Sequence, residues 1–454
     1  MALGLLAGVE PRYALVVAFG VVFVLLLLQS LAAGLAAFAV VSFLDLLPIG
    51  GAAVTIPKAA GLLLVVAWLA TLATRRETTR DFFGDHPYMT YVLLLFLAWA
   101  AASLLWAESV GAGAEAVYRY ALNILLFLVV YTAVGNRREA ILVVGAFLLG
   151  ALISALWGIA FPVPPESPDD IARLSGAGVE ANELAAVLVA SMVLATAFAA
   201  WKGAPLVRIM ALGMIGLCVF GVILSFSRGG LVALGVALIA AVVLGGRWRL
   251  AAATLLVAVT VGVAGYFALV ATPQERERVT TVGGGTGRSD IWAVGWRMVE
   301  SSPTNGIGVG NFPVTSVHFL LEPGALLRDE FIVDEPKVAH NIYLEVLAEL
   351  GVVGLAIFVT ILGFGVVSAV RAARAFGRCG DLRMELLARA VAVALLALLA
   401  ADFFVSEQFS KQLWLLLALG PSLLRVARAQ EALVAEEDEE SARAPIGPPV
   451  PAYG

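Results

Sequence analysis

Charged residues are scarce in this chain. Only 14% of its 454 residues are Asp, Glu, Lys or Arg, and 61% are hydrophobic. A soluble domain carries about a quarter charged residues. The composition therefore predicts an integral membrane protein with most of its length inside the bilayer.

Cysteine and histidine are also rare. The two cysteines are Cys218, inside an apolar run, and Cys379, in a basic loop. Their separation excludes a disulfide framework. The three histidines are His86, His318 and His340, and none belongs to a His, Asp and Glu set with metal-ligand spacing. No metal and no other cofactor is predicted.

Familiar signals are missing as well. The N-terminus has no basic region before its first apolar run and no A-x-A site after it, so we expect no cleavable signal peptide. The three glycines at 283–285 are not followed by the GK[ST] of a P-loop. They are either an anion cradle or a flexible hinge. No nucleic-acid partner is expected.

Long apolar runs dominate what is present. A spanning helix needs roughly 20 apolar residues. The candidates are Ala60–Thr74, Tyr88–Leu105, Tyr118–Val134, Glu139–Phe161, Ala181–Ala200, Pro205–Leu224, Leu231–Leu244, Leu250–Ala271, Asn341–Val370, Glu385–Phe404 and Gln412–Leu424. Upstream, Tyr13–Leu47 would be about 50 Å long as one helix, against a hydrocarbon core of about 30 Å. It is either one tilted helix or two helices meeting near Gln29 and Ser30. The fold class is all-α and polytopic, with about 12 transmembrane helices.

Basic residues fill alternate loops. The loops concerned are those of Arg75 to Arg80, Arg137 and Arg138, Lys202 and Arg208, Arg247 and Arg249, and Arg371 to Arg389. The positive-inside rule places these loops in the cytoplasm. The chain then divides into N-terminal transmembrane helices at 1–271, one large extracytoplasmic loop at 272–339, C-terminal transmembrane helices at 340–426, and a cytoplasmic tail at 427–454. The tail is acidic and then proline-rich, so we expect disorder.

Cationic and imidazole groups recur at the loop-to-helix junctions of the other side. Arg173 lies in "ARLSGAG", Arg228 in "SRGG", Arg288 in "GGGTGRSDIW" and His340 in "VAHNIYLEVLAELG". A helix N-terminus or a glycine backbone can approach an anion at such a junction. Arginines without matched carboxylates favour a phosphate ligand, which guanidinium binds through two hydrogen bonds. Next to a membrane, this predicts a lipid-linked phosphate.

Each of these residues has a second interpretation. Arg228 could simply extend to lipid headgroups, and His340 could be an interfacial polar residue. Asn341 can cap the helix that begins there. Glu345 could hold His340 or pair with an arginine, and Glu349 is expected in a structural ion pair.

Four stretches of the chain resemble the O-antigen ligase/polymerase superfamily of bacterial envelope glycosyltransferases. They are "RLSGAGVEANELA", "SFSRGG", "GRSDIWAVGWRMVESSPTNGIGVGNF" and "AHNIYLEVLAELGVVGL". The last two, in this order with one loop between them, are the specific signal. With the pattern of spans, the resemblance covers most of Tyr88 to Leu424.

The resemblance implies a GT-C-like architecture of about a dozen helices with one large periplasmic loop, in the bacterial inner membrane. It implies a metal-independent inverting glycosyltransferase that takes a glycan from undecaprenyl pyrophosphate. The acceptor is a sugar hydroxyl of lipid A-core, a growing glycan chain or, in some members, a protein. Arg228 and Arg288 match arginines that bind the pyrophosphate, and His340 matches a histidine that acts on the acceptor. Arg173 and Asn341 are further expected substrate contacts, whereas His318 has no partner in the motifs.

Other functions were weighed against this one. Ligase and polymerase share these motifs, so the acceptor stays open. A transporter of a lipid-linked solute would show repeats or broken helices with charges at the membrane midplane. Here the polar groups gather at one face, which favours chemistry there. A purely structural partner would not need a histidine beside several arginines.

Overall fold

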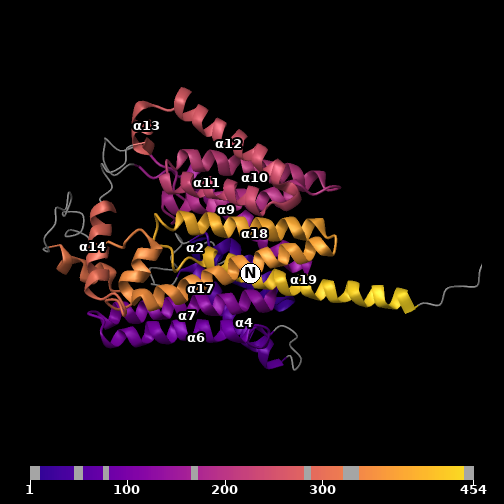
Figure 1. Cartoon of the computed structure of the whole chain (residues 1–454), viewed down its shortest axis with the longest axis horizontal. Coiled ribbons are helices and arrows are strands. Elements are labelled where there is room, and N and C mark those ends of the chain that lie inside the picture. Colours follow the sequence, from indigo (N-terminus) through magenta and orange to yellow (C-terminus); the bar gives the residue numbers. More distant parts are fainter. Residues whose placement is uncertain are drawn as a thin grey trace, which may run out of the picture.

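The computed structural model describes residues 11–44, 55–74, 81–164, 172–280, 288–320 and 337–443. Within these ranges the chain is helical and has no β-strand. The long helices run side by side in one bundle (Figure 1). This confirms the all-α class.

Nine helical segments of the described residues are long and apolar enough to cross a membrane. They lie in α4 (Ile56–Thr74), α6 (Pro87–Ala102) with the short helix after it, α7 (Val110–Ala133), α8 (Arg137–Ala160), α9 (Ala181–Ala199), α10 (Pro205–Leu224), α12 (Arg249–Leu269) with the turn before it, α17 (Ile342–Arg378) and α18 (Leu382–Ala401). Shorter apolar helices lie in α2 (Pro11–Gln29), α3 (Leu31–Val41) and α11 (Arg228–Leu244). The chain is therefore a polytopic membrane protein, and the count of about twelve spans stays a prediction.

The apolar stretch Tyr13–Leu47 forms two helices rather than one. Ser30 separates α2 from α3, and its extended backbone (φ −164°, ψ 150°) ends the first helix. Its hydroxyl accepts a hydrogen bond from Ala33 N at 3.0 Å and caps the second. The break lies near Gln29 and Ser30, which is where the two-helix alternative predicted from the sequence placed it.

The bundle has two ends, which we name by their elements. The α14 end carries α14 (Arg288–Ser301), α13 (Pro273–Thr280) and the turns at 103–109, 172–180, 225–227 and 402–410. The tail end carries the turns at 134–136, 200–204, 245–248 and 379–381, and α19 (Lys411–Arg443) projects from it. In Figure 1 the α14 end lies at the left and the tail end at the right.

Helix α17 is the central element. It packs against α19, α18, α6 and α14. Its first turns are interrupted at Gly351, whose φ of 67° is non-helical. Val352 N donates to Pro303 O at 2.9 Å across this kink. Any Cβ at Gly351 would collide with the carbonyl of Thr304, so glycine lets the loop after α14 dock against α17.

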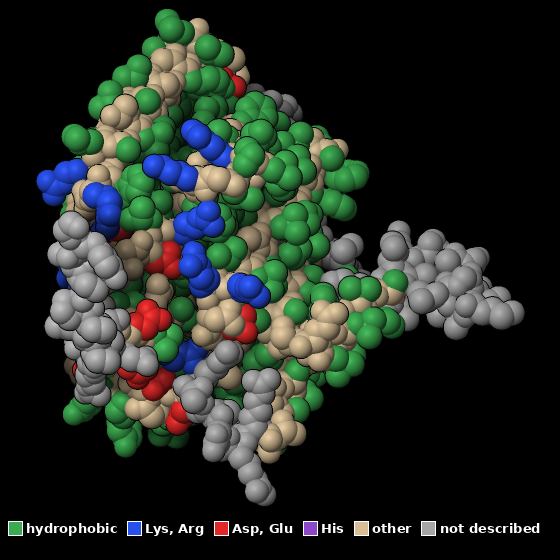
Figure 2. Space-filling view, turned by 90° about the vertical axis from the view of Figure 1, so that its right-hand side faces the viewer, with side chains coloured by type: hydrophobic (Ala, Val, Ile, Leu, Met, Phe, Trp, Pro, Cys, Tyr) green, Lys and Arg blue, Asp and Glu red, His purple; other side chains and the backbone are tan. Residues whose placement is uncertain are grey.

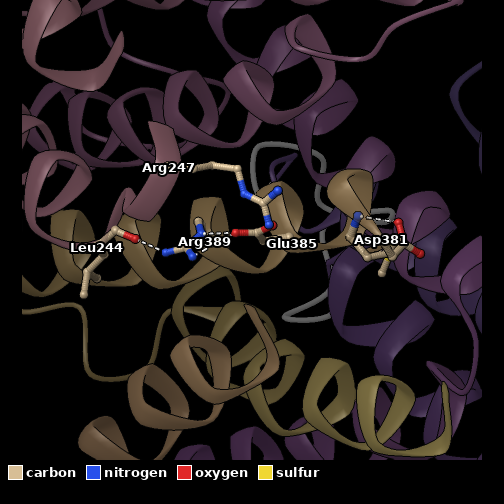
Figure 3. A network of polar contacts seen from close by, with 6 residues as sticks. Leu244, Arg247, Asp381, Glu385 and Arg389 are labelled. Carbon is tan, nitrogen blue, oxygen red and sulfur yellow. Dashed lines mark hydrogen bonds and ion pairs between the residues drawn. The ribbon is translucent and has the colours of Figure 1, made fainter. Parts of the chain in front are cut away.

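A buried acid holds the tail end together. Glu385 of α18 is 1% exposed and lies 2.7 Å from Arg247 and 2.9 Å from Arg389 (Figure 3). Arg389 also donates to the carbonyl of Leu244, the last residue of α11. The network therefore fixes the junction of α11 and α12 to α18.

The tail end also carries exposed basic side chains. The exposed ones include Lys202, Arg208, Arg247, Arg249, Arg371, Arg374, Arg378 and Arg383. Figure 2 looks onto this end and shows Lys and Arg gathered across it. They come from turns and helix ends that are far apart in the sequence.

Part of the expected disordered tail is helical. Helix α19 continues beyond residue 427 to Arg443. Ala, Glu, Arg and Gln dominate this stretch, and they are strong helix formers. Glu431 also pairs with Arg378 at 2.7 Å. The prediction of disorder covered 427–454; residues 427–443 are helical, and residues 444–454 lie outside the described part.

Candidate functional site

The first two motifs form one unit at the α14 end. Arg173 donates from Nε to Ser225 O at 2.9 Å and from Nη2 to Asn182 Oδ1 at 2.7 Å. Asn182 Oδ1 also accepts from the Ser227 hydroxyl at 2.9 Å. Arg173, expected as a substrate contact, thus clamps the turn before α11. Its predicted role toward a ligand stays a prediction.

Arg228 is the first residue of α11 and is half-buried. The turn before it contains Phe226 with φ 46°, and Ser227 caps the helix by accepting from Gly230 N at 3.1 Å. A Cβ at Gly230 would lie 2.8 Å from Cβ of Ala185, and one at Gly229 would lie 3.1 Å from Cβ of Phe404. The two glycines therefore bring the N-terminus of α11 against α9 and the 402–410 turn.

His340 lies just before α17 in an unusual backbone conformation. Its φ is 48°, and it is half-buried. Ile342 N donates to Asp402 O at 3.0 Å, which ties this junction to the 402–410 turn. Asn341 Oδ1 accepts from Tyr343 N at 3.0 Å and Leu344 N at 3.1 Å, so this oxygen is the N-cap of α17. Asn341 is 4% exposed. Its expected substrate contact stays untested.

Glu345 holds the backbone beside His340. It is buried and accepts from Ala339 N at 3.0 Å and Gln408 Nε2 at 2.6 Å. The Ser406 hydroxyl also donates to it. The sequence proposed that Glu345 holds His340 or pairs with an arginine; the bond observed is instead to the backbone N–H of Ala339, the residue before His340.

Arg288 and His340 are neighbours. Burial lowers the pKa of His340, and the charge of Arg288 lowers this pKa further, whereas Glu180 acts against the shift. Both effects favour the neutral imidazole, which is the form able to accept a proton. Burial is the larger of these two causes.

An aromatic contact joins the remaining parts. Trp292 of α14 donates from Nε1 to Ala339 O at 3.0 Å, and its ring lies 5.8 Å from that of Phe403 and 6.4 Å from that of Phe404. Phe404 in turn contacts the N-terminus of α11 at Gly229. This path connects Arg288, His340, Arg228 and Arg173 in one layer.

Sequence reasoning missed several acids in this layer. Asp402 is 3% exposed, and burial followed by the charge of Glu183 raises its pKa well above the usual range. The pKa of Glu407 is also raised, by loss of water, then by Glu183, to which it hydrogen-bonds, and by Asp402. The available signal was the position of these acids at the ends of apolar runs.

Other candidates lie elsewhere. His318 pairs with Glu108 at 2.8 Å, beside the turn between α6 and α7. Glu349 accepts from the backbone N–H of Phe312 at 3.0 Å rather than forming the expected ion pair. The three glycines at 283–285 lie outside the described residues. Among the described residues, no group of three or more His, Cys, Asp and Glu is placed to hold a metal ion.

The chain was compared with known proteins. Residues 213–359 match the family model described as O-antigen ligase. This range includes Arg228, Arg288 and His340, whereas Arg173 lies before it. No curated protein matches the chain at a significant level. The matched domain supports the resemblance to the O-antigen ligase/polymerase superfamily seen in the sequence.

Proposed function

We propose that this chain is an O-antigen ligase-like glycosyltransferase. It moves a glycan from undecaprenyl pyrophosphate to a sugar hydroxyl of lipid A-core. The observation that carries the proposal is the placement of His340 beside Arg288, in the layer where Arg228 begins α11. A neutral base next to cationic groups suits transfer of a sugar from a phosphate leaving group.

The proposed step is a displacement at the anomeric carbon. The acceptor oxygen attacks this carbon, and its proton passes to the imidazole of His340. The bond from the anomeric carbon to the pyrophosphate oxygen breaks, and the oxygen keeps the electron pair. Attack from the opposite side inverts the anomeric configuration. No metal takes part in this step.

Arg228 and Arg288 are proposed to bind the pyrophosphate. Each is the first residue of a helix, where the helix dipole favours an anion. Their guanidinium groups would stabilise the negative charge that develops as the bond breaks. Arg173 would act mainly by positioning the turn that carries Arg228.

The proposed location is the bacterial inner membrane, with the α14 end in the periplasm. The exposed arginines of the tail end support this orientation because cytoplasmic loops are rich in Lys and Arg. Substrate and product would then be lipid-anchored on the periplasmic leaflet.

The test is reconstitution of the purified chain with a lipid-linked glycan and separate acceptors: lipid A-core, a shorter lipid-linked glycan, and an acceptor protein. A ligase lengthens lipid A-core, and a polymerase lengthens the lipid-linked glycan. If the chain transfers glycan to none of these acceptors but moves the lipid-linked glycan across the vesicle membrane, it is instead a transporter.

A further inference from the structure

A cleft of about 470 Å³ lies at the α14 end, beside the end of α14 that is opposite to Arg288. Its walls are the turn between α6 and α7 and the segment that follows α14. Trp106, Glu108, Ser301, Ser302, Asn305 and Thr315 line it. Helix α14 has 14 residues, so Arg288 and Ser301, at its two ends, are about 20 Å apart. The cleft is thus a separate place from the proposed reaction centre.

The walls of the cleft are fixed by long-range hydrogen bonds. Asn311 accepts from Ser109 N at 2.7 Å and donates to Ser109 O at 3.2 Å. Val309 N donates to the Ser103 hydroxyl at 3.0 Å. Ile307 N donates to Ala348 O at 2.9 Å. A site whose walls are already ordered loses little entropy when a ligand binds.

The lining combines one aromatic surface with uncharged polar groups. Trp106 is 37% exposed, and its ring lies 5.9 Å from that of Trp99. Trp99 is itself held by a hydrogen bond from Nε1 to Leu350 O at 2.9 Å. Asn305 and Ser301 are exposed beside it and offer amide and hydroxyl groups.

This chemistry fits a carbohydrate. A sugar ring has an apolar C–H face that packs on an indole and hydroxyls that bond to amide and hydroxyl groups. No Lys or Arg lines the cleft among the described residues, which favours an uncharged ligand. The only carboxylate of the lining, Glu108, pairs with His318.

We propose that this cleft is a subsite for the glycan chain, several sugars away from the reacting bond. The claim that this glycan belongs to the transferred substrate rests on the proposed transfer function. The claim that the cleft binds a glycan does not. A subsite at this distance would hold a long glycan while its reacting end lies at Arg288 and His340. It would therefore favour long glycans over single sugars.

The test is direct binding to the detergent-solubilised full chain. The probe is the envelope polysaccharide of the bacterium that produces this protein. It is released by mild acid, freed of phosphate, fractionated by length and labelled with a fluorophore. Trp106→Leu should weaken binding by at least about tenfold, a typical cost of losing a central aromatic anchor. Trp106→Phe should keep much of it. Leu105→Ala, at a neighbouring residue that is 88% exposed, is the matched control.

The outcomes are separable. Binding that survives Arg228→Ala but not Trp106→Leu or Asn305→Ala supports the subsite, even if the wild type transfers no glycan. Wild-type protein that does not bind the probe overturns it. So does full binding by Trp106→Leu, or loss of binding in Arg228→Ala alone. Elution volume on gel filtration checks that each variant is folded. If Trp106→Leu is not folded, Asn305→Ala tests the cleft instead.

Discussion

At the scale of single residues, His340 combines an unfavourable backbone with a lowered pKa. A left-handed φ of 48° costs a non-glycine residue about 1–3 kcal/mol. Hydrogen bonds on both sides, from Ala339 N to Glu345 and from Ile342 N to Asp402 O, hold it in place. Such strain is typical of functional positions, where the surrounding structure fixes the side chain.

We predict that His340→Gln removes most of the transfer rate, by about 10²–10⁴-fold. Because the pKa of His340 is lowered, the wild-type rate should rise with pH and reach half of its maximum below about pH 6.5, the ordinary pKa of histidine. The glutamine variant should lack this rise. Rates measured from pH 5 to 8 check this. A variant that keeps the rate and its pH profile would exclude a general base.

For the arginines, we predict that Arg228→Ala and Arg288→Ala each lower the transfer rate by about 10²–10³-fold. Lysine should restore it only in part, because the planar fork is lost. Arg374→Ala, an exposed residue of the tail end, is the control and should transfer normally. A normal rate for Arg228→Ala would indicate that this arginine only contacts lipid headgroups.

At the scale of elements, the start of α17 organises the α14 end. Asn341 caps the helix, Glu345 reaches the 402–410 turn, and Glu349 reaches the loop that contains Phe312. The kink at Gly351 receives the loop after α14. One helix thus holds the segment of His340 and, through Ala348 and Glu349, the segment that lines the cleft near Trp106.

We predict that Gly351→Ala destabilises the protein by more than about 1 kcal/mol, because alanine disfavours φ 67° and its Cβ meets the Thr304 carbonyl. Gly363→Ala is the matched control in the same helix, since a Cβ there meets no atom within 4 Å. It should be neutral or stabilising. Thermal unfolding in detergent measures both, and equal midpoints would contradict the role of the kink.

A second prediction at this scale concerns Glu385. Removing the charge in Glu385→Gln leaves Arg389 and Arg247 without their buried partner, and should cost about 3–5 kcal/mol. Glu431→Gln breaks the more exposed pair with Arg378 and should cost no more than about 1 kcal/mol. The two variants are compared by thermal unfolding. Similar losses would mean that burial of Glu385 is unimportant.

At the scale of the whole molecule, the two ends differ in chemistry. The tail end presents exposed arginines, whereas the α14 end holds a half-buried histidine, acids with raised pKa and a polar cleft. An enzyme that joins two membrane-anchored substrates needs its binding and catalytic groups on one face of the membrane. The difference between the two ends agrees with the proposed function.

We predict that the α14 end is periplasmic. In intact cells, a membrane-impermeant thiol reagent should label Thr304→Cys and spare Arg374→Cys, in a background with Cys379→Ser. Both positions are exposed, and the remaining Cys218 is buried. After permeabilisation, Arg374→Cys should react as well. Labelling of Arg374→Cys in intact cells would reverse the orientation.

Much was determined by the sequence alone. The apolar runs predicted the helices, in one case to the residue at Pro205–Leu224. Local chemistry also placed Arg228, Arg288, His340 and Asn341 at helix starts. These properties depend on neighbours within a few residues, so a linear pattern contains them.

Only the tertiary structure decided what these residues meet. Arg173 binds the carbonyl of Ser225, 52 residues away, and Glu349 binds Phe312 N, 37 residues away. Asp402 and Glu407 join the site because their turn packs against α9 and the start of α17. The physical reason is that a buried polar group must find a partner, and packing of distant helices determines which partner lies within reach.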